Sequence, residues 1–116
     1  MILLVFLACS TTPLVEWSGD LKELQIQCQQ EPIPELKSAC AVQLAVLLGA
    51  DDQELNGMRV CYTIPEQFWR EECQFRLGEQ LSIVGNMESA LRQCTLAGRL
   101  TTECIHQAIW TEPHLK

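Results

Sequence analysis

The chain has 116 residues, of which 47% are hydrophobic, and its fifteen acidic and eight basic side chains give a formal net charge of −7. That length gives room for one domain with a limited core, and the moderate charged fraction excludes an intrinsically disordered chain. The acidic excess repels nucleic-acid phosphates and anionic lipid headgroups, so we expect no nucleic-acid partner.

Seven cysteines in so short a chain indicate an oxidising compartment. The alternative, a metal-binding protein, needs ligands at metal-binding spacing. There is no Cys-x-x-Cys, and the two histidines, His106 and His114, both lie near the end of the chain. We therefore expect no metal and no cofactor. An odd number of cysteines leaves one of them for a role other than an intramolecular disulfide.

The first predicted element is the apolar run at residues 1–8, MILLVFLA, which ends immediately before Cys9. It is too short to span a bilayer and is typical of the apolar core of an export signal peptide. The alternative is a buried strand or helix with Cys9 in the core. Phe6-Leu7-Ala8-Cys9 also resembles the lipobox of bacterial lipoproteins, although Phe6 replaces the usual Leu and no basic residue precedes the run.

That resemblance implies cleavage before Cys9 and attachment of a diacylglycerol to its thiol. Ser10 in the next position implies, by the same resemblance, the periplasmic face of the outer membrane. Residues 9–19 are then the lipidated cysteine and a short tether, which would hold the domain close to the membrane. A lipidated Cys9 accounts for the odd number and leaves six cysteines for disulfides.

The six remaining cysteines form a repeat. The first cysteine of each pair recurs every 33 residues, the second recurs once at 33 and once two residues earlier, and a helix breaker stands four residues after each first cysteine. The cysteines are Cys28 and Cys40, Cys61 and Cys73, and Cys94 and Cys104; the breakers are Pro32, Pro65 and Gly98. We infer three copies of one unit within residues 20–111, followed by a tail at 112–116.

Each unit is expected to form a helix, a turn and a second helix. The predicted helices are residues 20–30, 34–48, 52–63, 65–83, 87–97 and 101–111. Strand signals are nearly absent, so the predicted fold class is all-α.

Helix boundaries follow from capping and breaker residues. Capping boxes begin at Asp20 and at Asp51, and Asn86 is a further expected N-cap. Pro34 and Pro65 suit the first turn of a helix. Helices are expected to end at Gly49, Gly85 and Gly98. Pairs of Glu and Arg four residues apart support the helices. These pairs are Glu66–Arg70, Glu72–Arg76 and Glu88–Arg92.

In an antiparallel helical hairpin, residues equally distant from the turn face each other. This geometry predicts disulfides 28–40, 61–73 and 94–104, each closing a short loop worth about 3 kcal/mol in the chain-entropy treatment. Another pairing, which resembles the twin-cysteine hairpins of CHCH proteins of the mitochondrial intermembrane space, needs uninterrupted helices between the cysteines. Prolines at 32, 34 and 65 interrupt those stretches.

Unit length and helix-turn-helix organisation resemble tetratricopeptide repeats across residues 20–111, at the level of period and not of motif. The Trp, Gly and Ala positions of that family do not recur in series. The resemblance implies three disulfide-stapled helical hairpins in a short α-solenoid-like array.

No phosphate-binding loop, nucleophile elbow or zinc-protease motif occurs, so we expect a non-enzymatic protein. His106 is expected on a helix surface. Glu71 and Glu72 are adjacent, point about 100° apart on a helix, and are expected on a solvated face.

Aromatic side chains give the only predicted contact surface. Trp69 occupies a repeat position held elsewhere by leucines, which predicts core packing, and Trp110 is expected to cover the last helix pair. Phe68 aligns with Glu35 and Arg99, so it is expected to be exposed and is a candidate partner contact.

The sequence thus predicts a non-catalytic cell-envelope lipoprotein, whose disulfide-stabilised helical repeats bind a protein or peptide partner and whose Cys9 lipid binds the membrane. One alternative is a thiol-redox or metal-handling periplasmic protein, which needs free or strained cysteines. Another is a structural or assembly subunit of an envelope complex.

Overall fold

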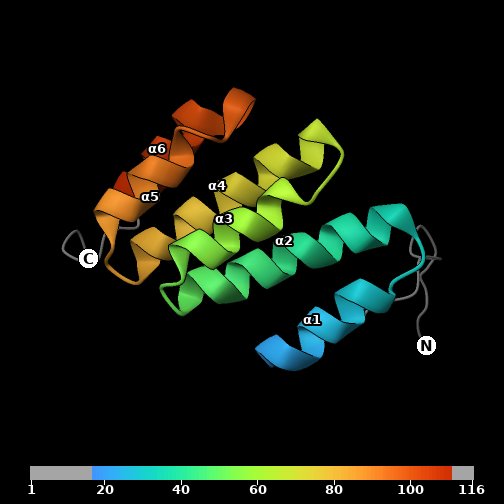
Figure 1. Cartoon of the computed structure of the whole chain (residues 1–116). Helices are drawn as coiled ribbons and strands as arrows, with labels where there is room; N and C mark the ends of the chain where they lie inside the picture. Colours follow the sequence, from blue (N-terminus) through green and yellow to red (C-terminus); the bar gives the residue numbers. More distant parts are fainter. Residues whose placement is uncertain (1–16, 111–116) are drawn as a thin grey trace, which may run out of the picture.

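The computed structural model describes residues 17–110, and this part of the chain is all-helical, as predicted. The helices follow one another across the molecule in chain order, with α1 at one end and α5 and α6 at the other (Figure 1). Their bounds are α1 Leu21–Gln30, α2 Pro34–Ala50, α3 Glu54–Tyr62, α4 Gln67–Ile83, α5 Met87–Cys94, the short 3-10 helix η2 Gly98–Leu100, and α6 Thr101–Trp110. The predicted signal peptide, Cys9, most of the tether and the tail lie outside the described residues.

Three disulfides link the two helices of each hairpin: Cys28–Cys40 joins α1 to α2, Cys61–Cys73 joins α3 to α4, and Cys94–Cys104 joins α5 to α6. The Cα atoms of the bridged residues are 5.4, 5.5 and 5.3 Å apart, which is ordinary disulfide geometry. These are the pairs predicted from spacing, and the twin-cysteine pairing is wrong.

Two of the three predicted helix caps are present. The Asp20 carboxylate accepts a hydrogen bond from the Glu23 amide at 3.0 Å, and the Asn86 side-chain oxygen accepts one from the Ser89 amide at 3.2 Å. The cap predicted at Asp51 is wrong, because α2 extends to Ala50 and leaves Asp51 in the turn. Helix α3 begins at Glu54 without a side-chain cap.

The predicted stops at Gly49 and Gly85 have different roles. Gly85 has a φ of +91° and ends α4 as expected, whereas Gly49 is buried inside α2. A Cβ on Gly49 would lie 2.9 Å from the Cβ of Gln80, so its absence lets α2 approach α4 closely. The turn after α2 instead uses Asp52, whose φ of 58° matches the left-handed conformation of Gly85, 33 residues later.

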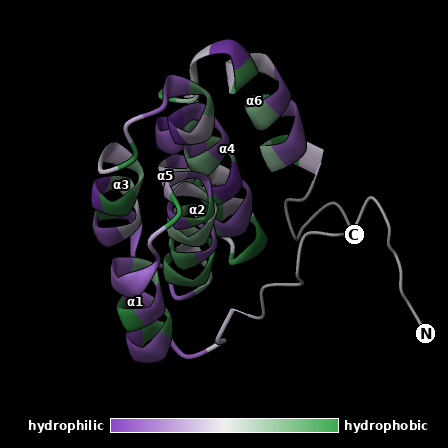
Figure 2. Ribbon diagram, turned by 90° about the vertical axis from the view of Figure 1, so that its right-hand side faces the viewer, coloured by the Kyte–Doolittle hydropathy of each residue, from purple (hydrophilic) through white to green (hydrophobic). Residues whose placement is uncertain are grey.

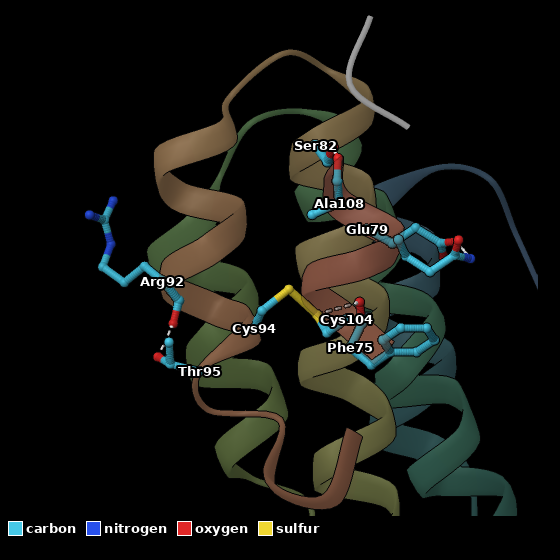
Figure 3. Close-up of a disulfide and its surroundings, with 9 residues drawn as sticks. Phe75, Glu79, Ser82, Arg92, Cys94, Thr95, Cys104 and Ala108 are labelled. Carbon is cyan, nitrogen blue, oxygen red and sulfur yellow. Dashed lines mark hydrogen bonds between the residues drawn. A yellow bond between two sulfur atoms is a disulfide. The ribbon is translucent and has the colours of Figure 1, made fainter. Parts of the chain in front are cut away.

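Helix α5 is shorter than predicted and ends at Cys94. Turn residues follow, and Gly98, with a φ of 58°, begins η2. Side-chain contacts then hold α6 against α4. The Ser82 hydroxyl donates to the Ala108 carbonyl at 2.5 Å. The Cys104 sulfur lies 3.8 Å from the Phe75 carbonyl oxygen, beside the buried Cys94–Cys104 bridge (Figure 3).

The core has two parts. The larger surrounds Leu77 and Leu81 of α4 and is completed by residues from α2, α5 and α6. The smaller lies between α1 and α2 and contains Leu24, Leu44 and Leu48. Helices α1 and α3 lie on the same side of α2 and α4 (Figure 2). The second and third hairpins therefore share one core, whereas the first is attached mainly through α2. That the units form a solenoid array stays a prediction.

Candidate functional site: a groove between the first two hairpins

A groove of about 680 Å³ lies between α1 and α3, with α2 as its floor. Below, it is called the α1/α3 groove. One wall carries Gln25 and Gln29 of α1, and the opposite wall is formed by the end of α3 and the following loop, which includes Ile64. A volume of this size lies within the range of about 300–1,000 Å³ that is usual for binding pockets.

The floor of the groove is apolar and its rim is polar. Ala41 and Leu44 of α2 lie at the bottom, whereas Glu31 and Lys37 stand at the rim. The Glu31 carboxylate accepts a hydrogen bond from the Ile33 amide at 3.2 Å and is thereby turned onto its own loop. An apolar floor with a polar border suits the apolar face of a bound peptide.

Covalent and hydrogen bonds fix both walls before any ligand arrives. The Cys28–Cys40 disulfide joins the α1 wall to the floor. On the other side, the Arg70 guanidinium donates to the carbonyls of Ile64 and Pro65 at 2.9 and 2.7 Å, which holds the loop after α3. Because little ordering remains to be done on binding, such a groove binds with a smaller entropic cost.

The equivalent interval between α3 and α5 is occupied by side chains. The Glu54 carboxylate accepts two hydrogen bonds from Arg92, at 2.9 and 2.8 Å, and one from the Gln93 amide at 2.6 Å. Gln93 is 1% exposed and its amide nitrogen lies 3.8 Å from the Met58 sulfur. Glu54, Arg92 and Gln93 are called the α3/α5 polar cluster below.

The hydrogen bonds of this cluster shift the pKa values of Glu54 and Arg92. Hydrogen bonds from Arg92 lower the pKa of Glu54 to about 2, against the opposing effect of burial, and hydrogen bonds from Gln93 and Ser89 add to the lowering. The same pair raises the pKa of Arg92. Glu54 is therefore a carboxylate, and Arg92 a cation, throughout the physiological range.

The repeat explains why one interval is open and the other is filled. Residues 33 positions before the polar cluster correspond to it in the sequence register of the cysteines. Glu54 corresponds to Leu21, Arg92 to Arg59, Gln93 to Val60, and Met58 to Gln25. The first interval thus retains the arginine but lacks both the acid that would bind it and the amide that fills the space.

Phe68, the predicted contact residue, is 57% exposed at the start of α4 and is not among the residues that form the groove. Its ring meets Trp69 edge-on at 5.6 Å, and the guanidinium carbon of Arg99 lies 4.6 Å from the ring centroid. Trp69 packs partly against the larger core, as predicted. A partner contact at Phe68 stays a prediction.

Two expectations about surface and core are wrong. Glu71 is only 8% exposed, because it pairs with Arg99 at 3.0 Å and lies against Gly98, where a Cβ would collide with its carboxylate. Trp110 is 73% exposed, because α6 ends there without a further helix in the described range to cover the ring. His106 is exposed on α6, as expected.

Among residues 17–110, no group of three His, Cys, Asp or Glu side chains has an arrangement that could hold a metal ion. Over the same residues, each helix is too short or too polar to cross a membrane. No family model, curated protein or solved structure matches this chain.

Sequence reasoning did not find the groove. Whether an interval between hairpins is open depends on the side chains that face it. The spacing of cysteines and breakers does not reveal which side chains these are. The informative signal is the apolar Leu21 at the place of Glu54, opposite an arginine that both units retain.

Proposed function

We propose that this protein is an exported, lipid-anchored, non-catalytic module that binds a peptide segment of a protein partner in the α1/α3 groove. The observation that carries the proposal is the groove itself, open and rigidly walled at the place where the next interval is filled by the polar cluster. Its apolar floor and its position between two helices suit a helical or extended segment.

The proposed location follows from the cysteines. Six of the seven form three disulfides, which persist in oxidising compartments, and Cys9 is the one that remains. Its position after Phe6-Leu7-Ala8 supports lipidation at the membrane. Intact-mass analysis of the protein isolated from its native membrane tests this: an acyl mass on a chain that begins at Cys9 is expected, and an unmodified thiol would contradict lipidation.

Site-specific photocrosslinking in cells tests the binding site. A photoreactive residue is placed at Gln25, which lines the groove, and, as a matched control, at Gln30, another exposed glutamine of α1 outside the lining. A protein adduct is expected from position 25 and not from position 30. Equal adducts from both positions, or none from position 25, would contradict binding in the groove.

A third photoreactive position, at Phe68, separates the groove from the aromatic surface predicted from the sequence. Phe68 lies outside the groove lining, so an adduct confined to that position would favour the role of an assembly subunit that docks through α4.

A further inference from the structure

The basic side chains of this acidic protein are divided between those that are bound and those that are not. Arginines 76, 92 and 99 pair with the carboxylates of Glu72, Glu54 and Glu71. In contrast, Lys22, Lys37, Arg59 and Arg70 form no ion pair with any acid among residues 17–110, and Arg70 donates instead to two backbone carbonyls. Of these, Lys37 lines the α1/α3 groove, and Arg59 lies outside the lining but directly precedes the lining residue Val60.

Arg59 stands in the register of an arginine that does bind a carboxylate. Arg92, 33 residues later, is held by Glu54 from the preceding unit through two parallel hydrogen bonds. The residue that corresponds to Glu54 in the preceding unit is Leu21, whose side chain cannot accept a hydrogen bond from Arg59. Among residues 17–110, the Arg59 guanidinium makes one long hydrogen bond, 3.5 Å to the Asn56 side chain on its own helix. Its paired donors are therefore available for an incoming carboxylate.

Two acids lie at the groove, and each already accepts a hydrogen bond: the Glu66 carboxylate accepts one from the hydroxyl of the lining residue Ser38 at 2.7 Å. Glu31 is the acidic residue in the lining, and it is hydrogen-bonded to the Ile33 amide on its own loop. Two cations without an acidic partner thus lie beside an apolar floor, although the whole chain carries −7. That overall charge repels an anionic membrane surface, whereas a short acidic peptide interacts mainly with the charges within a Debye length, about 8 Å at physiological salt.

We infer that the occupant of the α1/α3 groove is an amphipathic peptide segment of another protein that places apolar side chains on the α2 floor and a carboxylate on Arg59. This inference rests on the proposed function and specifies its partner. The bound carboxylate takes the place that Glu54 takes opposite Arg92, and a second acidic side chain reaches Lys37 at the far rim.

Two displayed libraries of short peptides test the inference. Both contain the same apolar residues, and the remaining positions are Glu or Gln in one library and Lys or Gln in the other. The native protein is expected to enrich acidic peptides. Arg59→Glu is expected to weaken the enriched peptides about tenfold or more, since it replaces a charge-assisted pair by a repulsion. Their affinity is expected to fall as salt concentration rises.

Lys22→Glu is the matched control for charge, because it makes the same change in net charge at an exposed position of α1 outside the groove lining. It is expected to leave the affinity within about twofold of the native value. An equal loss from Lys22→Glu would show that net charge and not Arg59 governs binding, and would overturn the inference.

Gln25→Trp, which fills the groove, and Gln30→Trp, which does not, separate this inference from the proposed function. If Gln25→Trp alone abolishes binding but the enriched peptides are basic or neutral, the groove binds peptides and the inferred acidic partner is wrong. If no peptide is enriched, or Gln25→Trp has no greater effect than Gln30→Trp, the proposed function fails as well. A dimer of the chain that Gln25→Trp dissociates would identify a second copy as the occupant and overturn the inference.

Discussion

The intervals α1/α3 and α3/α5 correspond in the 33-residue register of the sequence, yet one is an open groove and the other is filled. Between α3 and α5, a carboxylate, a guanidinium and a carboxamide bind one another across the gap. Between α1 and α3, the corresponding residues are Leu21, Arg59 and Val60, and the space above the α2 floor is empty of such contacts. The disulfides recur in register, and the left-handed turn residues Asp52 and Gly85 do as well, whereas the residues that face these intervals differ.

The comparison shows that polar side chains can fill an interval between hairpins only where each buried polar group finds a hydrogen-bond partner. Gln93 is almost fully buried, and its carbonyl oxygen has no hydrogen-bond partner among the described residues. Its amide nitrogen depends on Glu54. Because an unsatisfied buried polar group is costly, the Gln93 position requires the acid of the neighbouring unit. Val60 has no polar side-chain group that needs a partner, and the first interval stays open.

The largest effect is expected from removing the Cys28–Cys40 disulfide with Cys28→Ala and Cys40→Ala. Helix α1 is held by that bridge and by the smaller core alone, so its local stability should fall by about 3 kcal/mol while α3 to α6 remain folded. Hydrogen exchange resolved by helix measures this.

The matched control removes the Cys94–Cys104 bridge, which lies inside the larger core. There we expect the loss of protection to extend over α3 to α6. If both double variants lose protection in the same helices, the first hairpin is not an independent attachment and the contrast between the intervals fails.

A smaller loss is expected from Glu54→Ala, which removes the acceptor shared by Arg92 and Gln93. Leaving the buried Gln93 amide without a partner should cost about 2 kcal/mol of unfolding free energy, measured by urea denaturation. Glu88→Ala is the control, since Glu88 is an exposed acid near the same arginine and its loss should cost less than about 0.5 kcal/mol. Equal losses would mean that the cluster does not hold α3 to α5.

Acid should abolish the difference in unfolding free energy between the native protein and the Glu54→Gln variant. The pKa of Glu54 is about 2 in the folded protein and 4.5 without its partners. A lowered folded-state pKa stabilises the protein fully above pH 4.5, and this stabilisation is lost as the pH falls towards 2. Unfolding free energies of the two proteins are therefore expected to converge over that window, and a constant difference would contradict the role of the charge.

The smallest change in stability is expected from Leu21→Glu, which places an acid where the first unit lacks one. Loss of a partly buried leucine, about 1 kcal/mol, is offset in part by an exposed pair with Arg59, worth about 0.2–1 kcal/mol. The acidic peptides selected by the native protein should no longer bind, because Arg59 is occupied. A double-mutant cycle with Arg59→Ala measures the new pair, and zero coupling would show that position 21 does not reach Arg59.

Local sequence determined the helices, their caps at Asp20 and Asn86, and the pairing of six cysteines. Capping and turn formation involve residues close in the chain, and the cysteines lie equally far from each turn, so spacing alone brings them together. Only the tertiary structure decided the partners of the long polar side chains. Of the three predicted ion pairs, Glu72–Arg76 forms at 3.0 Å, whereas Arg70 binds two carbonyls and Arg92 reaches Glu54 in another hairpin.

Gly49 and the groove also depend on the tertiary structure. Gly49 stands within α2 because α4 packs too closely for a side chain, which no local pattern reveals. Leu21 and Val60, distant in sequence, pack against the smaller core and form no polar cluster like the one between α3 and α5. Spacing fixes contacts within a hairpin, but contacts between hairpins depend on how the helices pack and on the reach of each side chain.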